Sequence, residues 1–136
     1  MGIKDADHAE TNPGGQRLTV TALACSLAGQ EHLVRFVPGS RAHSLYATEA
    51  VVEPFFCSYG LNPEYRPAFE AAGLAFSAFG DDGEVRALEL PGHPYFVATL
   101  YVPQVRSRYG NPHPLISAFV EAARQHAEGL STSRAE

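Results

Sequence analysis

The sequence predicts an α/β fold in which helices flank a mixed β-sheet. Three patterns indicate it: several short β-branched segments alternate apolar and polar residues, a turn at 80–83 separates two of them, and two longer segments carry apolar residues at helical spacing. The 136 residues, 45% of them hydrophobic, suffice for one compact domain. We expect that domain at 17–130, after an acidic lead-in and turn at 1–16 and before a frayed tail at 131–136.

The first sixty residues predict three strands, over 17–22, 31–37 and 50–59. Leu18 and Val20 alternate with polar neighbours, which is typical of a strand with one buried face. Pro54 confines the third strand to a sheet edge or a bulge, because proline has no N–H to donate to a ladder. Between the second and third strands, Ser40 is placed to cap a helical turn that reaches Tyr46.

The second half predicts two helices and three strands, over 62–73, 74–79, 84–90, 95–102 and 114–129. Asn62 is a favourable N-cap, and the Gly-Asp-Asp-Gly turn is a hairpin signal. The nearly continuous apolar run 95–102 predicts a strand buried on both faces, which requires a covering layer on each side. One apolar stripe, including Leu115 and Phe119, predicts a last helix that begins at Pro114 and ends at Gly129.

Charge and hydropathy narrow the range of partners. Ten basic and 15 acidic residues give a net charge of −5, which argues against a nucleic-acid binder, since such proteins present a basic face. The sequence has no run of about 20 apolar residues of the kind a membrane helix needs. The first ten residues lack the apolar core of a secretory signal, so we expect a cytoplasmic protein that binds neither nucleic acid nor membrane.

The cysteines and histidines predict neither a metal site nor a cofactor. Cys25 and Cys57 are far apart and form no C-x-x-C motif, so we expect two free thiols, at least one of them buried. The six histidines are scattered, and none belongs to an H-E-x-x-H motif.

One segment carries a resemblance to a known family. The stretch 52–62, Val-Glu-Pro-Phe-Phe-Cys-Ser-Tyr-Gly-Leu-Asn, resembles the glutamine-site segment of the amidotransferase domain of CTP synthase. The likeness continues through the predicted helix and hairpin that follow it, and through the segments 93–98, 107–115 and 119–123. The resemblance implies a flavodoxin-like class I glutamine amidotransferase fold and a connection with pyrimidine biosynthesis. We find no counterpart of the nucleophile elbow, so we expect the C-terminal portion of that fold.

The resemblance also implies how the family mechanism would fail. Class I amidotransferases use a Cys-His-Glu triad, in which a thiolate attacks the glutamine amide and an imidazole carries the proton. The positions of the family's His and Glu hold Val102 and Gln104, which can neither accept a proton nor stabilise an imidazolium. The arginine that grips the glutamine carboxylate is replaced by Ser58. We therefore expect a catalytically degenerate amidotransferase-like domain that is inactive as a glutaminase.

A narrower resemblance draws attention to Cys57. The Cys-x-Tyr-Gly-Leu-Asn form of the motif is similar to that of the CTP synthase C-terminal region-related (seleno)proteins, some of which carry selenocysteine at this position. Redox or nucleophilic work at Cys57, with Glu53 beside it, is the implied alternative. Tyr59 and Gln104 are candidates to line a remnant substrate pocket, the latter at the carboxyl end of a predicted strand.

Structural roles compete with each of these functional interpretations. Cys57 can be a small apolar filler, Glu53 a solvated edge carboxylate and Tyr59 a packing residue. A second alternative is a binding or assembly module without catalysis, which would hold an unknown small molecule, a partner chain or a second copy of itself. Arg106 and Arg108 fit a solvated loop better than an anion site.

Overall fold

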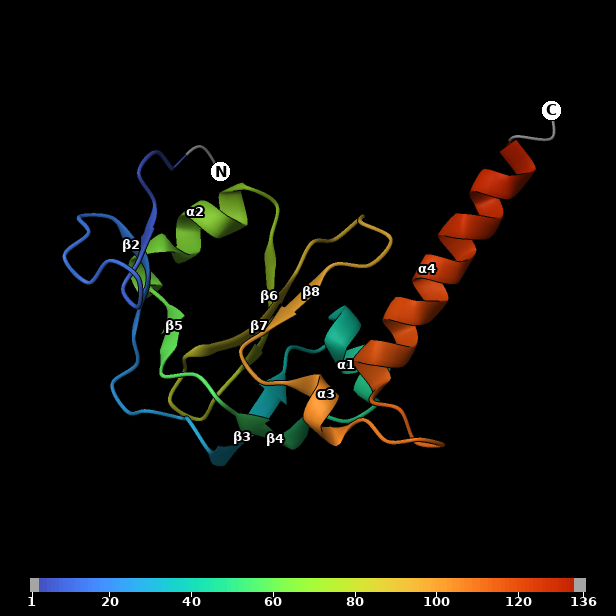
Figure 1. Ribbon diagram of the computed structural model, residues 1–136, viewed down its shortest axis with the longest axis horizontal. Helices are drawn as coiled ribbons and strands as arrows, with labels where there is room; N and C mark the ends of the chain where they lie inside the picture. The colour runs from blue at the N-terminus through green and yellow to red at the C-terminus, as the bar shows by residue number, and fades with distance from the viewer. Residues whose placement is uncertain (1–2, 134–136) are drawn as a thin grey trace.

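Two β-sheets and a long C-terminal helix make up the computed structural model, which describes residues 3–133 (Figure 1). The strands are β1 (Asp7–His8), β2 (Leu18–Ala22), β3 (Gln30–Phe36), β4 (Ala50–Phe55), β5 (Tyr59–Leu61), β6 (Ala75–Phe79), β7 (Val85–Glu89) and β8 (Val97–Thr99). The helices are α1 (Arg41–Tyr46), α2 (Arg66–Ala71), α3 (Pro103–Arg106) and α4 (Pro114–Ser133), with a 3-10 turn at Pro63–Tyr65.

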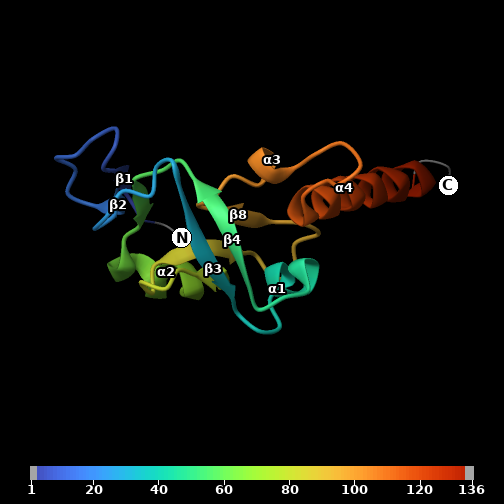
Figure 2. The ribbon, with the colours of Figure 1, turned by 90° about the horizontal axis from the view of Figure 1, so that it is seen from below.

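The larger sheet has the strand order β4-β3-β6-β7-β8 and is antiparallel throughout. The smaller sheet has the order β1-β2-β5, and its β1–β2 pair is parallel. The smaller sheet lies at one end of the molecule, the larger sheet lies in the middle, and α4 extends away from the opposite end (Figures 1 and 2). The predicted α/β class, with parallel and antiparallel pairs in its sheets, is confirmed.

Several local predictions are confirmed because short-range chemistry decides them. Ser40 caps α1, with its side chain accepting a hydrogen bond from the backbone N–H of His43 at 3.0 Å. Asn62 accepts from the N–H of Glu64 at 3.1 Å and so caps the 3-10 turn that leads into α2. The β6–β7 hairpin turns at Gly83, whose φ of +76° lies in the left-handed region that glycine tolerates.

The predicted strand 50–59 is two strands in two different sheets. β4 ends at Phe55 and occupies an edge of the larger sheet, as Pro54 requires, and β5 begins at Tyr59 in the smaller sheet. The three residues between them, 56–58, carry the chain from one sheet to the other. Cys57 therefore lies at the junction of the sheets and not within a strand.

The prediction of a strand buried on both faces over 95–102 is wrong. Only Val97–Thr99 pair with β7, and β8 is the last strand of the sheet, with Ala98 exposed. Two tyrosines, two valines, a phenylalanine and a leucine gave the run its apolar character. An edge strand can also carry such residues when each of its faces borders a cavity. Tyr101 alone of this run is fully buried, at 1% exposure, and bridges to Phe55.

The last helix also differs from its prediction. α4 continues through Gly129 to Ser133, so the predicted end at Gly129 is wrong. The frayed tail at 131–136 stays a prediction, and its residues 134–136 lie outside the described part. Leu115 is buried, but Phe119 and Val120 are 57% and 59% exposed. The apolar stripe thus packs on the body only through the first turns of α4, as the projecting helix in Figure 2 shows.

The core lies between the larger sheet, α1 and the start of α4. Its most buried members share an apolar cluster made of Leu27, Val34, Phe36, Ala42, Phe55, Ala78, Ala87, Tyr101 and Leu115. Glu89 fixes α1 to this sheet by accepting hydrogen bonds from the backbone N–H groups of Arg41 and Ala42 at 3.0 and 3.4 Å. Within residues 3–133, no helix is both long and apolar enough to cross a membrane.

Candidate functional site

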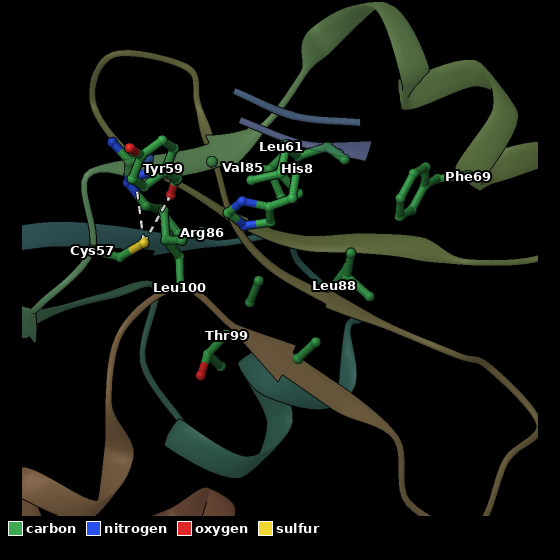
Figure 3. Close-up of a pocket in the computed structure, with 14 residues that line it drawn as sticks. His8, Cys57, Tyr59, Leu61, Phe69, Val85, Arg86, Leu88, Thr99 and Leu100 are labelled. Atoms are coloured by element: carbon green, nitrogen blue, oxygen red, sulfur yellow. Dashed lines mark hydrogen bonds between the residues drawn. The ribbon is translucent and has the colours of Figure 1, made fainter. Parts of the chain in front are cut away.

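A cavity of about 310 Å³ lies between the two sheets, at the point where the chain crosses from β4 to β5 (Figure 3). Its walls are mostly apolar and come from β2, β5, α2, β7 and β8. They include Val20, Leu61, Phe69, Leu88, Ala98 and Leu100. The polar or ionisable side chains His8, Cys57, Tyr59, Arg86 and Thr99 also line it. An apolar cavity with a few polar groups is the usual form of a small-molecule site.

Cys57 is held at one end of this cavity by its own turn. The Sγ atom accepts a hydrogen bond from the backbone N–H of Tyr59 at 3.3 Å and lies 3.4 Å from the Tyr59 carbonyl oxygen, to which the thiol donates. The ring of Tyr59 in turn contacts His8, with 5.5 Å between the centroids. Among the described residues, neither an imidazole nor a cationic group forms a hydrogen bond with Sγ. The geometry thus supplies the thiol with backbone partners, and no general base.

Arg86 is the buried cation of the cavity wall. Its side chain is 2% exposed, and its Nη2 pairs with the carboxylate of Asp82 in the β6–β7 hairpin, which is 51% exposed. The guanidinium also lies 5.5 Å from the centroid of the Phe55 ring. Two of its nitrogens, Nε and Nη1, are buried and have no hydrogen-bond partner among the described residues. Buried donors of a charged group without acceptors are rare and costly.

Glu53 lies apart from this cavity, in a buried polar cluster that we define as Tyr46, Glu53, Tyr101, Arg106 and His113. The Oε1 atom of Glu53 is 2.9 Å from the Tyr46 hydroxyl, which donates to it, and 3.2 Å from Nε2 of His113. Its Oε2 makes no hydrogen bond, and Nε of Arg106 lies 3.5 Å away. The cluster therefore joins β4, α1, α3 and the start of α4 through a single carboxylate.

Hydrogen bonds define the tautomer of His113. Its Nδ1 accepts from the backbone N–H of Leu115 at 3.3 Å, so the proton of the neutral ring is on Nε2. Nε2 then points at Glu53 and at the hydroxyl of Tyr46, 2.9 Å away. The Nε2–H of His113 thus donates to a buried carboxylate, which the guanidinium of Arg106 also approaches.

Burial raises the pKa of the hydroxyl groups of both tyrosines in the cluster. Loss of solvation raises the pKa of the Tyr46 hydroxyl far above its usual value, and the neighbouring Tyr101 and Glu53 raise it further. Loss of solvation likewise raises the pKa of Tyr101. Both hydroxyls therefore stay neutral over the physiological range and act as hydrogen-bonding groups.

Gln104 belongs to a second cavity, of about 480 Å³, beside α4. Val102, Pro103 and Gln104 line it together with Tyr101 and residues from the start of α4. Val102 is half-buried and precedes α3, and Gln104 is exposed within α3. Neither side chain offers a group that could carry a proton.

The structure brings together only one pair of the predicted site residues. Cys57 and Tyr59 line the cavity between the sheets, Glu53 lies in the buried cluster, and Gln104 lines the second cavity. Ser58 hydrogen-bonds Ser26, with 2.7 Å between the hydroxyl oxygens. Glu53 is thus no solvated edge carboxylate, since it is only 2% exposed.

Residues without a predicted functional role complete both sites. Arg106, expected in a solvated loop, pairs with Glu31 at 2.7 Å and approaches Glu53. His8 and Arg86 reach the cavity from segments with no motif. β7 carries two charged residues, Arg86 and Glu89, so the charge of Arg86 did not distinguish it in the sequence.

The thiol predictions are confirmed in part. Cys25 and Cys57 are both free, but Cys25 is exposed and Cys57 is half-buried, so the prediction of at least one buried thiol is wrong. Cys57 falls short of burial because it lies at the sheet junction, beside the cavity. Across residues 3–133, no group of three or more His, Cys, Asp or Glu side chains is placed to hold a metal ion.

Comparisons with known proteins place this geometry in a family context. No family model matches the chain. The chain is 36% identical to CTP synthase from Carboxydothermus hydrogenoformans over 132 residues, which cover 90% of this chain. It is 45% identical to CTP synthase from a Synechococcus species over 92 residues, which cover 67% of this chain. The glutaminase domain of Trypanosoma brucei CTPS, solved with bound acivicin, superposes on 90% of this chain with a TM-score of 0.81 and 26% identity. The chain is a relative of the CTP synthase glutaminase domain.

The match covers this chain far more completely than it covers its relatives. The chain spans 25% and 17% of the two CTP synthases and 52% of the solved glutaminase domain. The predicted flavodoxin-like class I amidotransferase fold is confirmed by the superposition. The activity of the complete CTP synthases is a property of those longer proteins.

Proposed function

We propose that this relative of the CTP synthase glutaminase domain is catalytically degenerate and does not hydrolyse glutamine. The observation that carries the proposal is the pair Val102 and Gln104 at the positions that the resemblance assigns to the triad His and Glu. An aliphatic group and a neutral amide cannot take the proton from a thiol or orient a base. The thiol within the glutamine-site segment, that of Cys57, forms hydrogen bonds only with backbone groups among the described residues.

An assay of ammonia release from glutamine tests the proposal directly. The Trypanosoma brucei glutaminase domain is the positive control, and the Cys57→Ser variant of this chain is the matched negative control. We expect equal background rates for this chain and for Cys57→Ser. Release well above background that disappears in Cys57→Ser would overturn the proposal and would make Cys57 the nucleophile.

Assembly is a second candidate function, favoured by the apolar surface that α4 leaves uncovered. Phe119 and Val120 are more than half exposed on one face of the helix, and two copies can bury such a face against each other around a two-fold axis. Light scattering at low micromolar concentration tests for a dimer. We expect Phe119→Glu to dissociate it and Tyr109→Ser, on a fully exposed loop tyrosine, to leave it intact. A stable monomer of the unmodified chain would contradict this function.

A further inference from the structure

His8 brings a hydrogen-bond donor to the cavity between the two sheets. Its Nδ1 accepts a hydrogen bond from the backbone N–H of Glu10 at 3.1 Å, so the proton of the ring lies on Nε2. Among the described residues Nε2 has no hydrogen-bond partner, and the half-buried ring lines the cavity beside Tyr59, with 5.5 Å between the centroids. Because Nδ1 faces the chain's own backbone, the Nε2–H edge on the far side of the ring is the edge available to a ligand.

Among the described residues, the rest of the cavity wall offers a ligand no accessible charge. The guanidinium of Arg86 lies against the Phe55 ring and pairs with Asp82, and its unpartnered nitrogens Nε and Nη1 are buried. No described acidic side chain lines the cavity. A charged ligand would therefore lose its hydration without gaining a counter-charge, which is costly. The cavity favours a neutral ligand.

Size and lining define the body of that ligand. The cavity volume of about 310 Å³ is near the lower end of the range typical for small-molecule sites, about 300–1,000 Å³. Tyr59 and Phe69 contribute aromatic rings to the wall, and in the view of Figure 3 the His8 ring lies between them. Leu61 and Leu88 add aliphatic surface. Aromatic side chains pack well against a flat ring, so this space suits a body of one or two aromatic rings.

We propose that the cavity between the two sheets binds a small neutral aromatic compound, whose carbonyl oxygen accepts a hydrogen bond from Nε2–H of His8. Burial of the aromatic body supplies most of the affinity, and the hydrogen bond orients the carbonyl group. Cys57 borders the same space, so a bound ligand should shield its thiol. This binding goes beyond the proposed loss of glutamine hydrolysis and the proposed assembly, and it depends on neither.

Benzophenone, diphenylmethane and diphenylacetate are suitable probes, because they share two phenyl rings and differ in a carbonyl group, no polar group and an anionic group. Equilibrium dialysis measures their affinities. We expect benzophenone to bind more tightly than diphenylacetate, by about ten-fold or more. In the Cys25→Ser variant, kept in the dark, benzophenone should also slow the alkylation of Cys57 by iodoacetamide. No binding of benzophenone up to its solubility limit, equal binding of diphenylacetate, or no protection of Cys57 would overturn the proposal.

Substitution of the histidine tests its role separately. His8→Phe removes the donor and keeps an aromatic ring, so it should weaken benzophenone binding about 3- to 10-fold. It should leave the affinity for diphenylmethane unchanged, because that hydrocarbon has no acceptor. The matched control is His126→Phe, the same change on the exposed part of α4, which should alter neither affinity. An equal effect of His8→Phe on both compounds would contradict the role of His8.

Photocrosslinking of benzophenone to the unmodified chain decides the location of the site even if His8→Phe does not fold. Irradiated benzophenone inserts into nearby C–H bonds, and mass spectrometry identifies the labelled peptides. We expect the label on peptides that carry cavity residues, such as Leu61 and Leu88. Labelling confined to other parts of the chain would overturn the proposal.

Discussion

Glu53 and Arg86 are buried to the same extent, each 2% exposed, yet their surroundings are opposite. Glu53 has groups from three other elements around it, with the Tyr46 hydroxyl and His113 on one oxygen and Arg106 near the other. Arg86 has one carboxylate, from the exposed Asp82, and two donors without partners beside a cavity. A buried charge surrounded by protein groups contributes to the stability of the fold, whereas a buried charge with unsatisfied donors reduces that stability.

His113→Leu should have the largest effect, because it breaks the cluster from inside. The substitution removes the Nε2–H donor to Glu53 and leaves a buried carboxylate with fewer partners. We expect the free energy of unfolding to fall by about 3 kcal/mol, as measured by urea denaturation. His126→Leu, on the exposed part of α4, is the matched control and should change it by no more than about 0.5 kcal/mol. A loss below about 1 kcal/mol for His113→Leu would contradict the structural role of the cluster.

Alkaline pH should loosen the same cluster through Tyr101. Burial raises the pKa of its hydroxyl in the folded state above the value of about 10 expected in the unfolded chain. Below pH 10 the Tyr101 hydroxyl is neutral in both the folded and the unfolded state, so it does not change the stability. Above pH 10 the hydroxyl loses its proton in the unfolded chain and keeps it in the folded state, so the stability falls as pH rises. We expect Tyr101 to contribute a decrease of about 1.4 kcal/mol per pH unit above pH 10.

Urea denaturation of the unmodified chain and of Tyr101→Phe, at several pH values from 9 to 11.5, isolates this contribution. The phenylalanine variant starts from a lower stability because it loses the contact with Tyr46, and its pH dependence should be shallower. Parallel curves for the two proteins would show that Tyr101 does not remain neutral in the folded state.

Arg86→Leu should cost much less than His113→Leu, and this difference is the sharpest test of the comparison. Its partner Asp82 is half exposed and becomes solvated when the arginine is removed, so no buried charge stays unpaired. The variant also loses two unsatisfied donors and keeps an apolar side chain in the wall. We expect a change in unfolding free energy within about 1 kcal/mol, similar to that of the control Arg35→Leu, which removes an exposed arginine paired with Asp81. A loss as large as that of His113→Leu would make Arg86 a structural residue.

The contrast between the two sites also explains what the sequence could predict. Caps, the hairpin and the edge position of Pro54 follow from chemistry within a few residues, and all three are found. The cluster around Glu53 joins residues that are up to 67 positions apart, and no local pattern encodes such a contact. The run 95–102 has the composition of a central strand, but strand position depends on which partners the whole chain supplies. The family resemblance reached the fold because it carries that long-range information.

The smallest expected effect concerns Cys57, and it separates a cavity-lining thiol from a catalytic one. A nucleophilic or redox thiol reacts faster in the folded protein than in the denatured chain, because its surroundings stabilise the thiolate. The Sγ of Cys57 has only the backbone of Tyr59 as its hydrogen-bond partner and is half-buried, which slows access without activating the sulfur. We therefore expect iodoacetamide, followed by mass spectrometry at neutral pH, to alkylate Cys57 several-fold more slowly in the folded protein than in urea.

Cys25, exposed in the same molecule, should react at similar rates in both states and so corrects for the effect of urea on the reagent. Faster labelling of Cys57 in the folded state would instead favour a thiol enzyme centred on Cys57. It would assign to His8 or Arg86, the cavity-lining residues able to carry positive charge, the task of stabilising the thiolate.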